Sequence, residues 1–123
     1  MKGLIVVVFA VGALAVGCSS SGGGNGPGAS GVASNKRLDS LTDAEKAAFC
    51  DWSNAKLGGY GTTMDCGGGI TIDAAASQAE CIADAPTNCS ATVGQAEACL
   101  NATSCSNLIP SQCAPLFNQN EDC

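Results

Sequence analysis

Residues 42–52 read TDAEKAAFCDW and contain the clearest helix signal in this 123-residue chain. Thr42 and Glu45 have the spacing of a capping box, in which two side chains satisfy the first free backbone N–H groups of a helix. Most of the residues that follow are good helix formers. Residues 58–59 are both glycine, which commonly ends a helix. We therefore predict a first helix that begins after Thr42 and stops before these glycines.

The apolar side chains around this helix recur with helical spacing. Leu41, Ala48, Phe49 and Trp52 fit a period of 3.6 residues. We predict that this helix supplies the largest apolar contribution to a small core, with Trp52 packed inside it. Tyr60 lies beside glycines and is the more exposed ring. In the alternative interpretation Trp52 and Tyr60 are ligand contacts that stack on a sugar, since each presents an apolar face and a polar tip.

Two further capping-box spacings occur along the chain. Ser77 precedes Glu80 by three residues, and Thr92 precedes Gln95 by three. They predict a second and a third helix. Alternative first residues for these two helices are Asp73 and Ser90.

The remaining segments are rich in glycine and proline. Residues 60–72 are broken by glycines and indicate a loop, with a short extended piece at 70–72. Residues 111–117 favour a short helical turn between prolines. The expected fold is mostly α, a small disulfide-rich domain of three to four short helices with long loops.

Cysteine is the most informative residue type in the second part of the chain. Eight cysteines follow residue 36, each at least five residues from the next: Cys50, Cys66, Cys81, Cys89, Cys99, Cys105, Cys113 and Cys123. Without a C-x-x-C pair, a structural zinc site and a thioredoxin-like redox site are both disfavoured. Four disulfides are predicted instead. Local links are preferred, namely Cys81–Cys89 and Cys99–Cys105, with the other four cysteines joining the first helix and its loop to the C-terminal end.

The composition explains why cross-links are needed. Residues 36–123 contain only 13 Leu, Ile, Val and Phe side chains among 88 residues, too few for a conventional core. Disulfide scaffolds fold without burying much apolar surface. The chain also has no histidine, which excludes imidazole bases and imidazole metal ligands. We predict no catalytic residue, no resident metal and no cofactor.

The N-terminus has the pattern of an export signal. Lys2 precedes an apolar run that is too short to span a bilayer as a helix. This run ends in residues 14–18, LAVGC, which resemble the lipobox of bacterial lipoprotein precursors. The resemblance implies cleavage before Cys18 and acylation of its sulfur. It also leaves an even eight cysteines for pairing. An ordinary secreted protein with a free Cys18 and an uncleaved membrane anchor are the alternatives.

Three regions are therefore expected. Residues 1–17 are a signal peptide, and residues 18–35 are the lipidated cysteine with a flexible Gly/Ser-rich tether. Residues 36–123 are the eight-cysteine domain. From Cys18 onward the chain has 4 Lys+Arg against 11 Asp+Glu, which disfavours nucleic acid as a partner.

The leader, tether and scattered cysteines resemble uncharacterised cysteine-rich bacterial lipoproteins, a group that implies no activity. We expect a monomer outside the cytoplasm, anchored to an envelope membrane through Cys18, that acts as a structural or binding module rather than an enzyme. The alternatives are a carboxylate-dependent cell-wall hydrolase and a disulfide-rich protease inhibitor that presents residues 87–91. Calcium binding by Asp65 and Asp73 around a glycine loop is disfavoured, because the dense acids of an EF-hand loop are missing.

Overall fold

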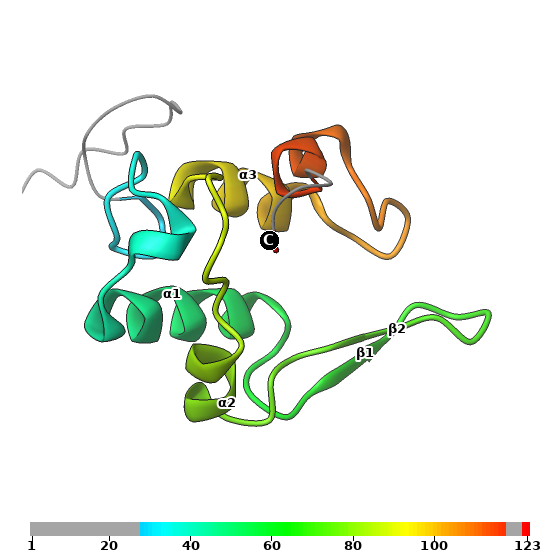
Figure 1. Cartoon of the computed structure of the whole chain (residues 1–123). Helices are drawn as coiled ribbons and strands as arrows, with labels where there is room; N and C mark the ends of the chain where they lie inside the picture. Colours follow the sequence, from blue (N-terminus) through cyan, green and yellow to red (C-terminus); the bar gives the residue numbers. More distant parts are fainter. Residues whose placement is uncertain (1–27, 118–121) are drawn as a thin grey trace, which may run out of the picture.

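The computed structural model describes residues 28–117 and 122–123. The predicted signal peptide, Cys18 and the first part of the predicted tether lie outside the described residues. Three α-helices, two 3₁₀ helices and one antiparallel strand pair make up the described part (Figure 1). In chain order the elements are η1 (Leu38–Ser40), α1 (Asp43–Lys56), β1 (Thr63–Asp65), β2 (Thr71–Asp73), α2 (Gln78–Ala83), α3 (Val93–Ala102) and η2 (Ser111–Leu116).

The predicted capping residues begin the three α-helices. The Oγ1 atom of Thr42 accepts a hydrogen bond from the Glu45 backbone N–H, and the Glu45 carboxylate accepts one from the Thr42 backbone N–H. Thr92 forms the same reciprocal box at the start of α3. Ser77 caps α2 through its side chain. These three helix predictions are confirmed, because local capping chemistry determines where each helix starts.

The glycine-rich segment after α1 differs from the predicted loop, although β2 overlaps the extended piece predicted at 70–72. It forms a β-hairpin in which Thr63 pairs with Asp73, and Met64 with Ile72. The turn consists of residues 67–69, three glycines that all have positive φ. Only glycine adopts this backbone region without steric cost, so the same residues that suggested a loop form a tight turn. The domain is therefore disulfide-rich and largely helical, with a small sheet.

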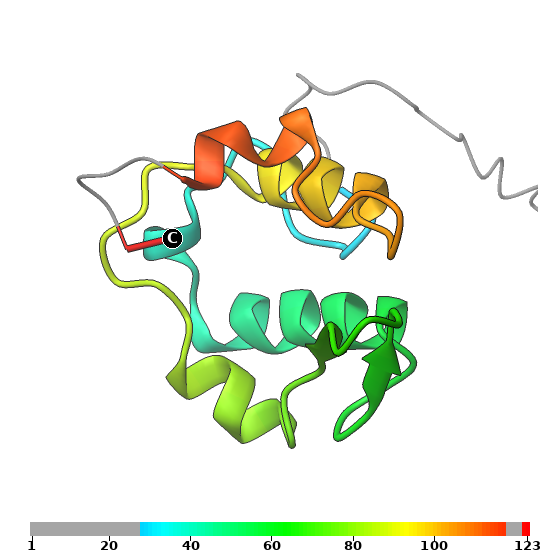
Figure 2. The ribbon, with the colours of Figure 1, turned by 90° about the vertical axis from the view of Figure 1, so that its right-hand side faces the viewer.

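The helices are arranged in layers (Figures 1 and 2). Helices α3 and η2 lie on one side of α1, and α2 lies on the other side. We call residues 43–83 the α1–α2 layer and residues 93–116 the α3–η2 layer. The hairpin belongs to the α1–α2 layer and extends past the C-terminal end of α1.

Disulfides pair all eight cysteines of the described part, as the cysteine count predicts. The four bonds are Cys50–Cys81, Cys66–Cys105, Cys89–Cys123 and Cys99–Cys113. The preferred links Cys81–Cys89 and Cys99–Cys105 are wrong. Each layer instead has one internal bond, α1 to α2 and α3 to η2, while Cys66–Cys105 joins the two layers. Pairing follows which helices pack together, and sequence spacing does not reveal that.

The apolar core lies beside the first turn of α3. Val93 and Cys89 are fully buried. The core cluster comprises Val32, Leu38, Leu41, Cys89, Ala91, Val93 and Ala96. Helix α1 contributes only the partly buried Ala48 and Phe49, so the prediction that α1 supplies most of the core is wrong. Small side chains around Val93 let several backbone segments approach closely, whereas α1 turns its buried residues Cys50 and Asn54 toward α2.

The folded part begins earlier than residue 36. Val32 is only 3% exposed, and the Ser34 carbonyl accepts a hydrogen bond from the Gly94 backbone N–H. The backbone N–H of Ser30 donates to the buried carboxylate of Glu97 at 2.7 Å. A side chain at Gly28 would overlap with that carboxylate. Residues 28–35 therefore pack against α3 although their composition indicates a flexible tether.

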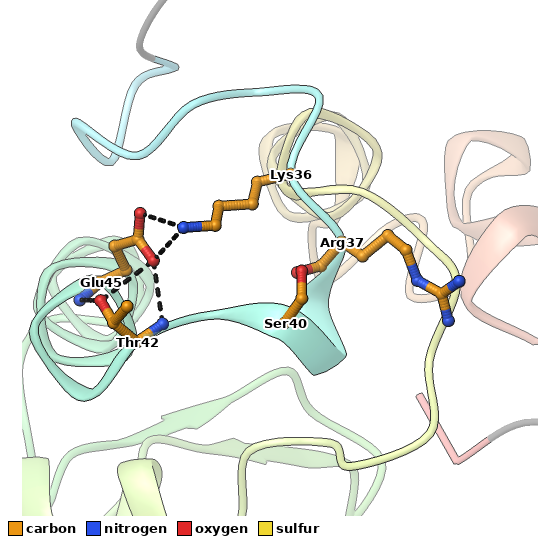
Figure 3. Close-up of polar contacts among 5 residues, drawn as sticks. All are labelled: Lys36, Arg37, Ser40, Thr42 and Glu45. Atoms are coloured by element: carbon orange, nitrogen blue, oxygen red, sulfur yellow. Dashed lines mark hydrogen bonds and ion pairs between the residues drawn. The ribbon is translucent and has the colours of Figure 1, made fainter.

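Electrostatic contacts fix the start of α1 against this N-terminal segment (Figure 3). The Lys36 ammonium lies 2.6 Å from both carboxylate oxygens of Glu45, the same carboxylate that caps α1. The Lys36 and Thr42 hydrogen bonds lower the pKa of Glu45 to about 2. The side chain of Ser40 donates to the Arg37 carbonyl and closes η1. The N-terminal segment is thus fastened to α1 as well as to α3.

Candidate functional site

A pocket of about 210 Å³ lies between the two layers, where the ends of α1 and α3 meet the hairpin. Its apolar walls come from four half-buried side chains on different elements. They are Leu57 after α1, Met64 on β1, Ile72 on β2 and Leu100 on α3. Apolar walls with a few polar groups are the usual composition of a small-molecule site.

The hairpin presents one apolar face to this pocket. Met64 and Ile72 are direct cross-strand partners, so their side chains point to the same side of the sheet. Both are half-buried, while the threonine and aspartate on either side of each are exposed. This alternation follows from the two-residue period of a strand.

The disulfide between the layers lies next to the pocket. Cys66 follows Met64 by two residues, and Cys105 directly follows the lining residue Ser104. A two-stranded hairpin is only marginally stable alone in water. The covalent link therefore holds the hairpin wall near the α3 wall.

The polar lining is dominated by one cation. Asn101, Thr103 and Ser104 contribute neutral groups, and the exposed Lys56 contributes the only charge. The Lys56 ammonium lies 5.7 Å from the centroid of the Trp52 ring, within the range of a cation–π contact. Lys56 is also in the last turn of α1, where a positive charge is favoured by the helix dipole.

Lys56 differs from the other cations of residues 28–117. Lys36 pairs with Glu45, Arg37 with Asp39, and Lys46 lies 3.7 Å from Asp43. Lys56 has no carboxylate partner among the described residues. The chain has a formal net charge of −6, and among its described residues one positive charge is not neutralised by a carboxylate and lies beside the pocket.

The two rings expected as ligand contacts lie outside the pocket lining and have different neighbours. Trp52 is half-buried against Phe49, with ring centroids 5.8 Å apart. The Tyr60 hydroxyl donates to Asp51 at 2.8 Å. Burial and this hydrogen bond raise the pKa of Tyr60 to about 12. Tyr60 therefore fastens the end of α1, and a sugar that stacked on the Trp52 face under Lys56 would have to displace the ammonium.

The carboxylates are dispersed. None of the pocket-lining residues is acidic. Asp65 accepts from the Gly67 backbone and Asp73 from Thr63, at opposite ends of the hairpin pairing. In the part of the chain that the structure describes, no three Cys, Asp or Glu side chains are grouped as metal ligands. A hydrogen bond from Arg37 lowers the pKa of Asp39.

The loop that the protease-inhibitor alternative invokes, residues 87–91, alternates between exposed and buried residues, with Thr87, Asn88 and Ser90 exposed. Cys89 is fully buried and Ala91 is 3% exposed. The Ala91 carbonyl accepts a hydrogen bond from the Leu38 backbone N–H, and the Cys89 carbonyl accepts one from the Asp39 backbone N–H. Residues 87–91 are therefore held against η1 by backbone hydrogen bonds and two buried side chains, while the other three residues are exposed.

Sequence reasoning missed the pocket walls. A signal was present, because residues 63–65 read TMD and residues 71–73 read TID. Each triplet places one apolar residue between two polar ones, the pattern of a strand with one covered face. Leu57 and Leu100 carry no comparable signal, since their meeting depends on how α1 and α3 pack.

No protein-family model, curated protein or solved structure matches this chain at a significant level. Among residues 28–117 and 122–123, no helix has the length and apolar character needed to cross a bilayer.

Proposed function

We propose that this chain is a lipid-anchored bacterial cell-envelope protein whose disulfide-stabilised domain is a binding module. The observation that carries the proposal is the closed cysteine count. Four bonds use all eight cysteines from Cys50 to Cys123, which leaves Cys18 as the one odd cysteine of nine. Disulfides persist in oxidising compartments, and an odd cysteine in an exported chain needs a separate role. Acylation at the lipobox supplies that role.

The pocket supports binding in preference to catalysis. Its lining has four apolar walls, three neutral polar residues and Lys56, without a carboxylate. General acid–base chemistry with paired carboxylates requires two of them close to the substrate. The acids of the described part are instead dispersed: Asp51 accepts hydrogen bonds from Tyr60 and Gln78 at the surface, and the buried Glu97 accepts one from the Ser30 backbone.

Membrane fractionation of a Cys18→Ser variant tests the anchor. A diacylated cysteine holds a protein on a membrane because two acyl chains bury many methylene groups, at about 0.8 kcal/mol each. We expect the wild type in the membrane fraction and Cys18→Ser in the soluble fraction. Ser21→Ala, a change in the same segment, is the matched control and should remain with the membrane. If Cys18→Ser also stays in the membrane fraction, the lipid anchor is refuted.

A further inference from the structure

We propose that the pocket between the hairpin and α3 binds a small apolar carboxylate, with its hydrocarbon part between Met64, Ile72 and Leu100 and its anionic group at Lys56. This inference rests on the proposed binding function and names its ligand class. It is carried by the coincidence of an apolar cavity with the only described cation that has no carboxylate partner.

The cavity volume sets the size of the ligand. Cavities of about 150 Å³ in protein interiors hold a benzene molecule. A volume of about 210 Å³ therefore fits about eight to ten non-hydrogen atoms. Benzoate and hexanoate have this size, whereas long-chain fatty acids are too large to be enclosed.

The positive charge at the pocket predicts a negatively charged ligand. Lys56 is exposed while the four apolar walls are half-buried, so the positive charge lies on the solvent side of the hydrocarbon-lined space. A ligand with an apolar body and one terminal anionic group matches both features. A carboxylate at Lys56 would also be free of repulsion from the pocket itself, because no lining residue is acidic.

The polar neighbours add hydrogen-bonding capacity next to Lys56. The Asn101 side chain has no hydrogen bond to any other described residue, so its amide is available to a ligand. The Thr103 hydroxyl is already used, donating to the Cys99 carbonyl at 2.8 Å. Asn101 is therefore the residue expected to assist Lys56.

Trp52 supplies a direct readout of binding. It is the only tryptophan in the chain, and the Lys56 ammonium lies over its ring. An anion that engages Lys56 changes the electrostatic environment of the indole and hence its fluorescence. Titration of the full chain carrying Cys18→Ser, followed by Trp52 emission and by calorimetry, measures binding whether or not the protein is lipid-anchored.

The ligand panel separates charge from apolar body. We expect saturable binding of benzoate and hexanoate, with Kd on the order of 1 mM. Benzyl alcohol has the ring without the charge, whereas acetate and inorganic phosphate have charge without the apolar body. Each of these three compounds should bind at least about tenfold more weakly than benzoate. Added salt should weaken benzoate but not benzyl alcohol. Equal affinity for benzoate and benzyl alcohol, or tightest binding of phosphate, would overturn the proposal.

Two variants locate the site. Lys56→Met should weaken benzoate about tenfold and leave benzyl alcohol unchanged, whereas the control Lys46→Met, a lysine paired with Asp43, should change neither. Ile72→Phe fills the cavity and should weaken both ligands, with far-UV circular dichroism verifying that the fold is retained. Unaltered benzoate affinity in both Lys56→Met and a folded Ile72→Phe refutes the site. Such a failure leaves the membrane anchor untouched, since Cys18→Ser fractionation tests it separately.

Discussion

The α1–α2 layer and the α3–η2 layer each contain one internal disulfide, but their helices differ in how many residues they bury. Helix α3 buries four residues, whereas α2 buries none and α1 buries only Cys50 and Asn54. The apolar core is built around Val93 at the start of α3. With only 13 large aliphatic or Phe side chains in residues 36–123, the chain has apolar material for one small core.

The α1–α2 layer is held by other means. Cys50–Cys81 links its two helices covalently. The buried amide of Asn54 donates to the Cys50 carbonyl and accepts from the Ala75 backbone, both at 2.8 Å. A covalent bond and one well-satisfied buried amide can thus hold together a helix pair that has few buried apolar side chains.

The largest expected difference between the layers concerns their internal disulfides. Residues 50 and 81 are separated by 31 positions and residues 99 and 113 by 14. Loop-closure entropy then gives losses of about 4 kcal/mol for Cys50→Ser with Cys81→Ser, and about 3 kcal/mol for Cys99→Ser with Cys113→Ser. Urea unfolding measures both values.

Helix content sharpens the same test. The six-residue α2 cannot be stable by itself, so losing Cys50–Cys81 should also remove its signal from the far-UV circular dichroism of the folded protein. Helix α3 should persist without Cys99–Cys113 because its buried face remains. If helical signal is lost only in the variant with Cys99→Ser and Cys113→Ser, the α3–η2 layer depends on its disulfide more than the α1–α2 layer does.

Replacement of the buried amide should have the next largest effect. Asn54→Ala leaves the half-buried Ala75 N–H without its acceptor, and we expect a loss of about 2 kcal/mol in the free energy of unfolding. Ser53→Ala is the matched control, since the Ser53 hydroxyl also donates to the Cys50 carbonyl but reaches no other segment. It should cost less than about 0.5 kcal/mol. If Asn54→Ala and Ser53→Ala lower the free energy of unfolding equally, the hydrogen bond from Ala75 to Asn54 does not stabilise the α1–α2 layer.

The smallest expected effect is a pH dependence at the junction of the N-terminal segment with α1. The folded state lowers the pKa of Glu45 to about 2 from an ordinary value of 4.5, mainly through the Lys36 hydrogen bond. The ionised carboxylate therefore stabilises the folded state above pH 4.5, and this contribution is lost as the pH falls toward 2. Urea midpoints measured across this range should fall less steeply in Glu45→Gln than in the wild type.

Lys36→Met provides the second arm of that measurement. Because the Lys36 hydrogen bond is the largest cause of the low pKa, this variant should flatten the pH dependence as Glu45→Gln does. If Lys36→Met leaves the pH dependence of the urea midpoint unchanged, the low pKa of Glu45 comes from the helix cap alone.

The sequence predicted what is encoded locally. Thr42, Ser77 and Thr92 cap helices because the cap and its partner lie within three residues of one another. The existence of four disulfides followed from the cysteine count, but their pairing depends on which helices pack. Val32 lies in a segment whose composition is typical of a tether, but it packs in the core with residues of α3. The sequence gives no sign of this contact. The pocket was missed for the same reason, since Leu57 and Leu100 meet through tertiary packing.

The docking of residues 28–35 has a mechanical consequence. Tension that reaches residues 28–35 from the N-terminal side is passed to α3 through Glu97 and Val32. Backbone hydrogen bonds from Gly94 to Ser34 and from Val93 to Lys36 share this load. The load is thus divided between α3, the best-packed helix, and the start of α1, where Lys36 pairs with Glu45.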